Sequence, residues 1–390
     1  MRALRILRTT IIVLAITAGI YTVADYIVGL WRPQQVDVTI ADGSAVPAYR
    51  NQPYVNADFI REKTLEPGEW RQVPGQYLVT PSEYHGTYFN IDKLAPTGNL
   101  YRRTANPPPN GKPERVVLLV GGSTLYGPEV PDDSTIASQL SKRLNILDPD
   151  FHYVVYNAGV VAADSAQDRD RVAYELSRGL RPYIVIAIDG PLDIVYGIYQ
   201  GRPGQPAPLL LARTGWRGFL HEYLPTNIAQ LVHLWFHDRA VAQHRKVAPA
   251  QLASPPVTVD LTQMTADLYI KNLQAMAKNA AGARFLAVLP PSPFSTPYDH
   301  KTKDLDYARA IAEAQMPKVT GVLQRGQVAL SAALTKLKAP GVEVLDLSAA
   351  LKPKTVDVFV DQGHLNATGY GMLADRIAQA ILAPVIVSLP

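Results

Sequence analysis

The sequence predicts a doubly wound α/β domain, in which a parallel sheet of five strands lies between two layers of helices, preceded by one transmembrane helix. Short apolar runs alternate with helical segments, as in parallel strands joined by crossover helices. These runs are too short for helices and rich in valine and isoleucine, which is typical of strands buried on both faces. A longer apolar run stands near the N-terminus. The candidate strands are residues 116–120, 152–156, 183–188, 283–289 and 342–347.

Helices are expected between and after these strands. Asp132-Asp133-Ser134 offers an N-cap for a helix that runs to about Asn145. One or two helices are expected over residues 307–338, with a break near Gly321 to Gly326. The remaining helices are predicted at about residues 165–177, 261–279 and 368–382.

Two segments depart from the alternation. Residues 32–112 are proline-rich, with an edge strand expected at Tyr88 to Asp92 and no sign of catalytic residues. An insertion at about 198–260 is aromatic and rich in histidine, and is a candidate lid, substrate-shaping element or subunit contact. His233 and His237 stand four residues apart, but no third ligand follows at a recognised zinc spacing, so no metal site is predicted.

The amino-acid composition excludes several classes of protein and site. The chain has 390 residues, of which 47% are hydrophobic and 18% charged, so it can bury a substantial core. It contains no cysteine, which excludes disulfides, thiolate zinc sites and a cysteine nucleophile. The net charge of +4 is spread along the chain without a basic run, so no nucleic-acid partner is predicted.

The N-terminal residues predict the location of the protein. Residues 1–8 carry Arg2, Arg5 and Arg8, and residues 9–31 are mostly apolar, which indicates a single-pass anchor with its N-terminus in the cytoplasm. The alternative is a cleavable signal peptide. In both cases the domain at 113–390 is exported, and in a bacterium it would lie in the periplasm, at the inner membrane.

Asp25 is the one acidic residue of this apolar run. An ionisable group in a membrane span is costly unless it reaches water or a partner. Its position near the outer end favours contact with the interface, and the alternative is contact with another membrane subunit.

Two short motifs indicate chemistry. The first strand ends in Gly121-Gly122-Ser123-Thr124, which presents a serine at the carboxyl edge of the sheet, where α/β folds place their ligands. A serine hydroxyl needs a general base and a group that orients that base. Asp361-Gln362-Gly363-His364 supplies both, because the aspartate can bind one ring nitrogen of His364 while the other nitrogen faces Ser123.

These motifs resemble those of the SGNH or GDSL-type hydrolases, a family with a flavodoxin-like three-layer α/β/α fold and a Ser-Asp-His triad. The resemblance covers roughly Tyr88 to Leu382. It implies Ser123 as nucleophile, His364 as base and Asp361 as the partner of the base. It also implies that the activity needs no metal or organic cofactor.

The middle motifs match the family less well. The segment Asn157 to Gln167 resembles the second block, with Ala162 at the position of the glycine whose N–H joins the oxyanion hole. Gly190 to Asp193 resembles the third block, but Leu192 replaces an asparagine that would donate to the oxyanion. Loss of one such donor typically lowers the rate by about 100-fold to 1,000-fold. The N–H groups of Ser123 and Ala162 remain as donors, and Asn157 is a further candidate.

Two functions follow as hypotheses. The first is a membrane-anchored esterase or acyltransferase that acts on an O-acyl ester, most plausibly acetyl, of a cell-envelope glycan. The second is a catalytically impaired structural or assembly subunit of a membrane complex, with contacts through Asp25 and residues 198–260. The missing asparagine favours the second, and the presence of all three triad residues favours the first.

Overall fold

The computed structural model describes the domain that follows the N-terminal segment. The described residues are 52–65, 70–73, 78–204, 260–280, 282–294, 318–337, 339–351, 358–361 and 363–383, with the single residues 17, 309, 312, 313 and 316. All except Thr17 belong to one compact unit, Val38–Leu211 with Thr258–Pro390; the second unit is Met1–Asp37 with Ala212–Val257.

Several predictions therefore fall outside the described residues. They are the anchor at 9–31 apart from Thr17, Asp25, and the part of the insertion that contains His233 and His237. Within the described ranges, no helix combines the length and the hydropathy that crossing a membrane requires.

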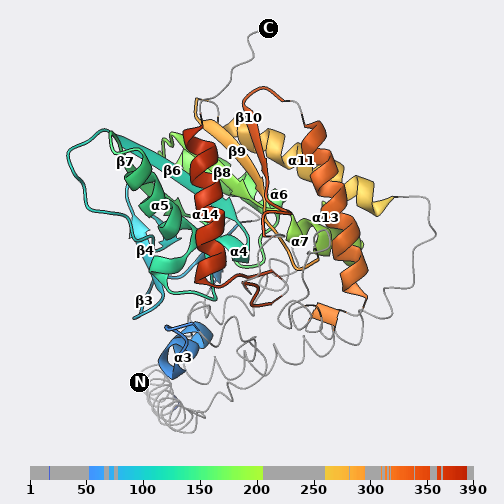
Figure 1. Ribbon diagram of the computed structural model, residues 1–390, viewed down its shortest axis with the longest axis horizontal. Helices are drawn as coiled ribbons and strands as arrows, with labels where there is room; N and C mark the ends of the chain where they lie inside the picture. The colour runs from blue at the N-terminus through green and yellow to red at the C-terminus, as the bar shows by residue number, and fades with distance from the viewer. Residues whose placement is uncertain are drawn as a thin grey trace, which may run out of the picture. The chain divides into compact units, whose positions relative to one another are not determined.

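The core is a sheet of eight strands in the order β10-β9-β8-β6-β7-β5-β4-β3 (Figure 1). The five strands from β10 to β7 are parallel, and the other three extend the β7 edge in antiparallel pairing. The parallel part has the flavodoxin-like order 2-1-3-4-5, in which ligands bind beside the first strand. Its strands are β6 Glu114–Gly121, β7 His152–Asn157, β8 Ile184–Ile188, β9 Arg284–Leu289 and β10 Val342–Asp346.

Helices cover both faces of the sheet, as predicted. Alternate residues of β6 point to opposite faces, so Val117 and Leu119 pack on one side and Leu118 and Val120 on the other. The first side carries α5 Ile136–Leu147 and α14 Ala367–Leu382, which lie next to each other. The second side carries α6 Ser165–Ser177, α11 Leu261–Asn279 and α13 Val319–Lys336.

The predicted sheet was too small, because the proline-rich segment contributes strands. The polar hairpin of β4 and β5 continues the sheet, and Arg102 of β5 pairs with Asn157 of β7. A separate two-stranded sheet and one helix also come from this segment. The elements are α3 Ala57–Leu65, β1 Trp70–Gln72, β2 Val79–Pro81, β3 Tyr84–His85, β4 Asn90–Leu94 and β5 Asn99–Arg102.

Two helix predictions were wrong in detail. Asp132 does not cap α5, because its carboxylate binds the buried Arg102, with Nε 2.6 Å away; residues Asp132–Ser134 form a short 3₁₀ turn, η2, and Thr135 is the cap. Helix α13 runs without a break through Gly321 and Gly326. A Cβ at Gly326 would lie 2.3 Å from Cγ2 of Ile194, so this glycine permits close packing of the helix.

Candidate active site

Ser123 stands at the carboxyl end of β6, where two glycines allow the chain to turn sharply. A Cβ at Gly121 would lie 2.5 Å from the carbonyl oxygen of Ile188, and one at Gly122 would lie 3.0 Å from that of Ala163. Larger residues would therefore push the loop away from its neighbours. Ser123 begins the short helix α4 Ser123–Tyr126, so its N–H has no acceptor within the helix.

The structure brings Ser123, His364 and Asp361 together. Nε2 of His364 lies 2.8 Å from Oγ of Ser123, and Nδ1 lies 2.7 Å from Oδ2 of Asp361. The ionised carboxylate of Asp361 only accepts hydrogen bonds, so Nδ1 carries the proton and Nε2 accepts from the serine hydroxyl. This tautomer allows His364 to take the serine proton.

The loop of His364 is built around Asp361. Oδ1 of Asp361 accepts from the N–H groups of Gly363 at 2.8 Å and His364 at 2.9 Å. Burial opposes ionisation of Asp361, but the charge and hydrogen bond of His364 and these N–H donors outweigh it and lower its pKa to about 2. The hydroxyl of Thr124 donates to the carbonyl of Gly363 at 2.9 Å, which ties the serine loop directly to the histidine loop.

The pKa of His364 is raised by its neighbours. Burial alone would lower the pKa of its imidazole, but the charge and hydrogen bond of Asp361 and the charge of Glu129 raise it above its usual value. A more basic imidazole is a better acceptor for the serine proton. The side chains of His364 and Asp361 are each 16% exposed, so water screens them only partly.

Ala162 lies in a loop that contacts the serine loop, since the carbonyl oxygen of the next residue, Ala163, is 3.0 Å from a Cβ built on Gly122. Its φ of 64° is left-handed, a conformation that glycine adopts without cost and alanine does not. The hydroxyl of Tyr196 donates to its carbonyl at 3.1 Å and fixes the peptide. Within the described part of the chain, the N–H of Ala162 donates to no acceptor. It is thus available, like the N–H of Ser123, to a bound oxyanion.

The other two candidates differ in their fit. Leu192 of α7 Pro191–Ile194 lies beside the serine loop, because its Cδ1 is 3.3 Å from the position of a Cβ on Gly122. This agrees with the resemblance of Gly190 to Asp193 to the third block, in which Leu192 replaces the asparagine donor. The interpretation of Asn157 as a substitute donor is not supported, since its buried amide donates to Leu125 and accepts from Gly159. Asn157 instead holds the ends of two loops together.

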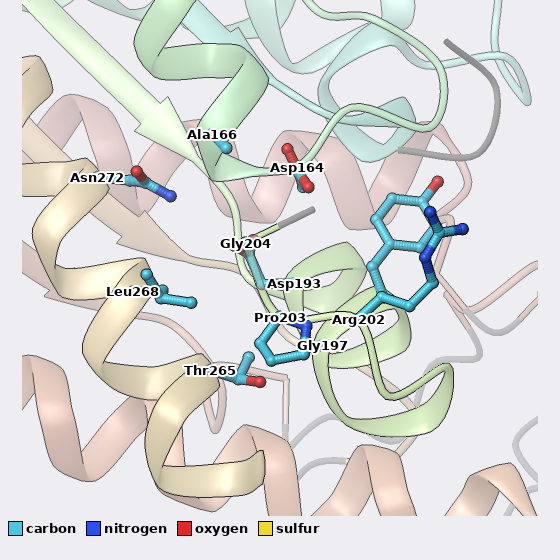
Figure 2. Close-up of a pocket in the computed structure, with 11 residues that line it drawn as sticks. Asp164, Ala166, Asp193, Gly197, Arg202, Pro203, Gly204, Thr265, Leu268 and Asn272 are labelled. Carbon is cyan, nitrogen blue, oxygen red and sulfur yellow. The ribbon is translucent and has the colours of Figure 1, made fainter. Parts of the chain in front are cut away.

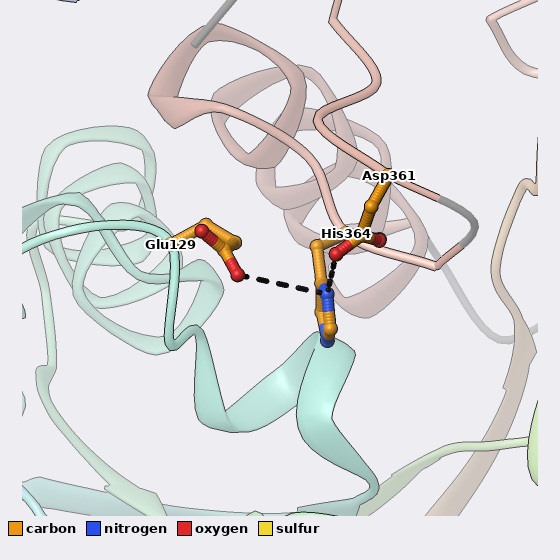
Figure 3. A group of neighbouring side chains, drawn as sticks. All are labelled: Glu129, Asp361 and His364. Atoms are coloured by element: carbon orange, nitrogen blue, oxygen red, sulfur yellow. Dashed lines mark hydrogen bonds and ion pairs between the residues drawn. The ribbon is translucent and has the colours of Figure 1, made fainter. Parts of the chain in front are cut away.

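Two residues of the site were missed in the sequence (Figure 3). Glu129 is 5% exposed, and its Oε1 lies 3.9 Å from Nδ1 of His364. Lys63 of α3 forms a short ion pair with the other oxygen of Glu129. Burial raises the pKa of Glu129, and the charges of Lys63 and His364 oppose that rise. No motif marks either residue, and Lys63 stands in the segment that seemed free of catalytic features.

Glu129, Asp361 and His364 also have the composition of a small metal site. Their ligand atoms lie within 4.8 Å of one another. However, Glu129 is paired with Lys63 and Nδ1 of His364 with Asp361, so a cation would have to displace both contacts. The prediction that no metal takes part in the reaction stays a prediction.

A pocket opens beside the site, between α6 and α11 (Figure 2). It is lined by Asp164, Asp193, Tyr196 and Asn272 among others, and its described lining does not include the triad. Asp193 binds the hydroxyl of Ser165 and so joins the loop after β8 to the start of α6. Tyr196 connects this pocket to the loop of Ala162, because its hydroxyl donates to the carbonyl of Ala162.

Two buried carboxyl groups lie at Asp168 of α6 and at Asp189, which directly follows β8. Asp168 and Asp189 are almost fully buried, and each has one oxygen without a hydrogen-bond donor among the described residues. Burial raises the pKa of Asp168 to about 7, and burial together with the charge of Asp168 raises the pKa of Asp189 well above its usual value. The folded state therefore favours the protonated form of these carboxyls.

The chain is similar to several solved hydrolases. One is a lipase/acylhydrolase from Enterococcus faecalis, with 14% identity over 68% of this chain and 95% of that one, at a TM-score of 0.36. Another is a G-D-S-L family lipolytic protein from Veillonella parvula, with 11% identity over 70% and 100% of the two chains, at 0.37.

An acetylxylan esterase from Geobacillus stearothermophilus matches with 11% identity over 69% of this chain and 95% of that one, at a TM-score of 0.36. No family model and no curated protein matches the chain. Because these identities and TM-scores are low, function is inferred from the geometry of the site itself.

Proposed function

We propose that the protein is a serine ester hydrolase or acyltransferase of the SGNH type, in which Ser123, His364 and Asp361 act as a triad. The observation that carries the proposal is the continuous hydrogen-bonded chain from Oγ of Ser123 through both nitrogens of His364 to Asp361. A further support is the presence of two backbone N–H groups, of Ser123 and Ala162, for the oxyanion.

The mechanism follows from the tautomer of His364. Nε2 takes the proton of Ser123 while Oγ attacks the ester carbonyl, and the oxyanion develops near the two N–H donors. The tetrahedral intermediate collapses as His364 protonates the leaving alcohol, which leaves an acyl-serine. Water or a sugar hydroxyl then gives its proton to His364 and attacks the acyl group, which releases Ser123.

The finer proposals concern location and substrate. The arginine-flanked apolar run at 9–31 supports a single-pass inner-membrane anchor with the domain in the periplasm. Such a location brings the site near envelope glycans, and an acetyl ester of such a glycan is the proposed substrate.

The test is turnover of a chromogenic acetyl ester by the full chain and by Ser123→Ala. We expect Ser123→Ala to lose at least about 1,000-fold in kcat. Equal rates for the two proteins would remove the enzyme proposal. Addition of an oligosaccharide acceptor separates the two reactions, because a transferase yields acylated sugar and a hydrolase yields free acid.

Leu192 favours a second candidate, a structural subunit with an impaired site. A leucine next to Gly122 supplies no donor where the resemblance implies one. If the protein is a structural subunit, we expect the full chain to purify in a stable complex with other membrane proteins and Ser123→Ala to assemble as well as the wild type. Loss of the complex on Asp25→Leu would then identify the membrane span as a contact.

A further inference from the structure

His364 faces a second carboxylate in addition to Asp361. Glu129 follows α4 by three residues and approaches the Nδ1 edge of the ring at 3.9 Å. This distance is too long for a hydrogen bond, so Glu129 acts on His364 through charge. Asp361 already accepts the Nδ1 proton, and the structure assigns a separate role to Glu129.

Glu129 is held in place from the N-terminal segment. Lys63 of α3 reaches its Oε2, and both side chains are largely buried, with 12% and 6% exposed. Helix α3 is itself fixed to the sheet, because Glu62 accepts the N–H groups of Thr87, Tyr88 and Phe89. These two contacts, from Lys63 to Glu129 and from Glu129 to His364, thus connect the N-terminal segment to the proposed base.

Resting on the proposed function, we propose that Glu129, clamped by Lys63, is a positioning residue that places a second negative charge beside the imidazole of His364. The charge stabilises the imidazolium that forms when Ser123 gives up its proton. Lys63 limits this effect, and its charge lowers the pKa of Glu129 against the rise that burial causes. The pair therefore adjusts how basic His364 is, in addition to Asp361, which raises the pKa of His364 more strongly and sets its tautomer.

The charged groups around the ring set the direction of the expected effects. Asp361 and Glu129 raise the pKa of His364, and Lys63 lowers it. Tyr54 and Tyr370 are the other titratable groups near Glu129, and burial keeps both neutral by raising their pKa above the usual range. Removal of Glu129 should therefore lower the pKa of His364, and with it the pH at which the base becomes active.

The experiment compares Glu129→Gln with the wild type in the full chain. We expect the acid limb of the kcat/KM profile to move to lower pH by about one unit, since a charge within about 4 to 6 Å shifts a pKa by this order. The rate on the pH plateau should fall about tenfold, because a less basic imidazole removes the serine proton less well. A profile that keeps its acid limb would overturn the inference.

The matched control is Glu62→Gln. Glu62 precedes Lys63 in the same helix, but its carboxylate accepts hydrogen bonds from backbone N–H groups and, among the described residues, forms no hydrogen bond with Glu129. The Glu62→Gln variant should lower thermal stability without moving the acid limb. Lys63→Gln tests the ion pair between Lys63 and Glu129. Without Lys63 we expect Glu129 to take up a proton and lose its charge. Adding Glu129→Gln to this variant should then move the acid limb of the kcat/KM profile little further. If the shift of the acid limb in the double variant equals the sum of the shifts in the two single variants, the role assigned to Lys63 is refuted.

A readout that needs no turnover separates this inference from the proposed function. The ¹⁵N NMR titration of His364 in the full chain, in the Ser123→Ala background, reports the imidazole directly. A lower pKa in Glu129→Gln supports the positioning role even if the wild type hydrolyses no ester. An unchanged titration contradicts it even if the wild type is an active esterase.

Discussion

Replacing Leu192 by asparagine should raise the esterase rate, because it puts a donor where the site has an apolar group. Asparagine branches at the same atom as leucine, so its amide nitrogen can take the place of Cδ1, which lies 3.3 Å from a Cβ built on Gly122. Removing one oxyanion donor from a site built for it costs about 100-fold to 1,000-fold. An added donor that was not selected for its geometry should return about 10-fold to 100-fold, or about 1.4 to 2.7 kcal/mol of transition-state stabilisation.

The same change should lower stability. Leu192 is half-buried, and its loss should reduce the free energy of unfolding by about 1 to 2 kcal/mol. Rate and stability thus move in opposite directions, so a general loosening of the fold cannot imitate the result. The assay is kcat/KM for a chromogenic acetyl ester, with Leu192→Met as a control of similar volume that has no donor. If Leu192→Asn is no faster than Leu192→Met, Leu192 does not face the oxyanion.

Three further predictions concern backbone strain and buried charge. Ala162→Gly should raise the free energy of unfolding by about 1 kcal/mol, measured by denaturant melts, because φ at this residue is left-handed; a loss of stability would contradict the strain argument. Asp361→Asn should lower kcat by about 10,000-fold through the wrong tautomer of His364. It should also lower the free energy of unfolding at neutral pH by about 2 kcal/mol, because a carboxylate with its pKa lowered to about 2 stabilises the folded state; a tenfold loss of kcat or less would be too small for a triad. Asp168 has a pKa raised to about 7, so the folded state keeps a proton that the unfolded chain releases above about pH 4, and stability should fall as pH rises from about 4 to 7. Asp168→Asn, whose amide oxygen can still accept a hydrogen bond from protonated Asp189, should flatten that fall in a series of melting temperatures, and an unchanged slope would contradict the raised pKa of Asp168.

The parallel part of the fold could be predicted because its signal is local. All five parallel strands and α6 and α11 follow from apolar runs and caps read within about 20 residues. Among the antiparallel strands of the eight-stranded sheet, only β4 Asn90–Leu94 was expected, as the edge strand at Tyr88 to Asp92. The other two were missed, because β3 has only two residues and β5 joins the parallel sheet through a single pair with the distant Asn157. Asp132 shows the same limit: as a sequence it is a good helix cap, and in the fold the buried Arg102 binds it instead.

The candidate site divides in a similar way. Ser123 and the Asp361–His364 pair were found because glycines before a serine and an Asp-x-x-His spacing leave a local mark, and their meeting follows from the order of the strands. Glu129 and Lys63 leave no such mark, because their contact joins positions 66 residues apart. The left-handed φ of Ala162 was also hidden, since an alanine in that conformation has no sequence signal.

The most direct test of the triad is covalent labelling of the full chain by a fluorophosphonate, followed by peptide mass spectrometry. We predict one adduct on Ser123, formed at a rate that rises with pH through the ionisation of His364, no adduct in Ser123→Ala, and labelling at least about 100-fold slower in His364→Gln. A wild-type chain that stays unlabelled, or that labels equally fast without His364, would contradict the assignment of Ser123 as an activated nucleophile.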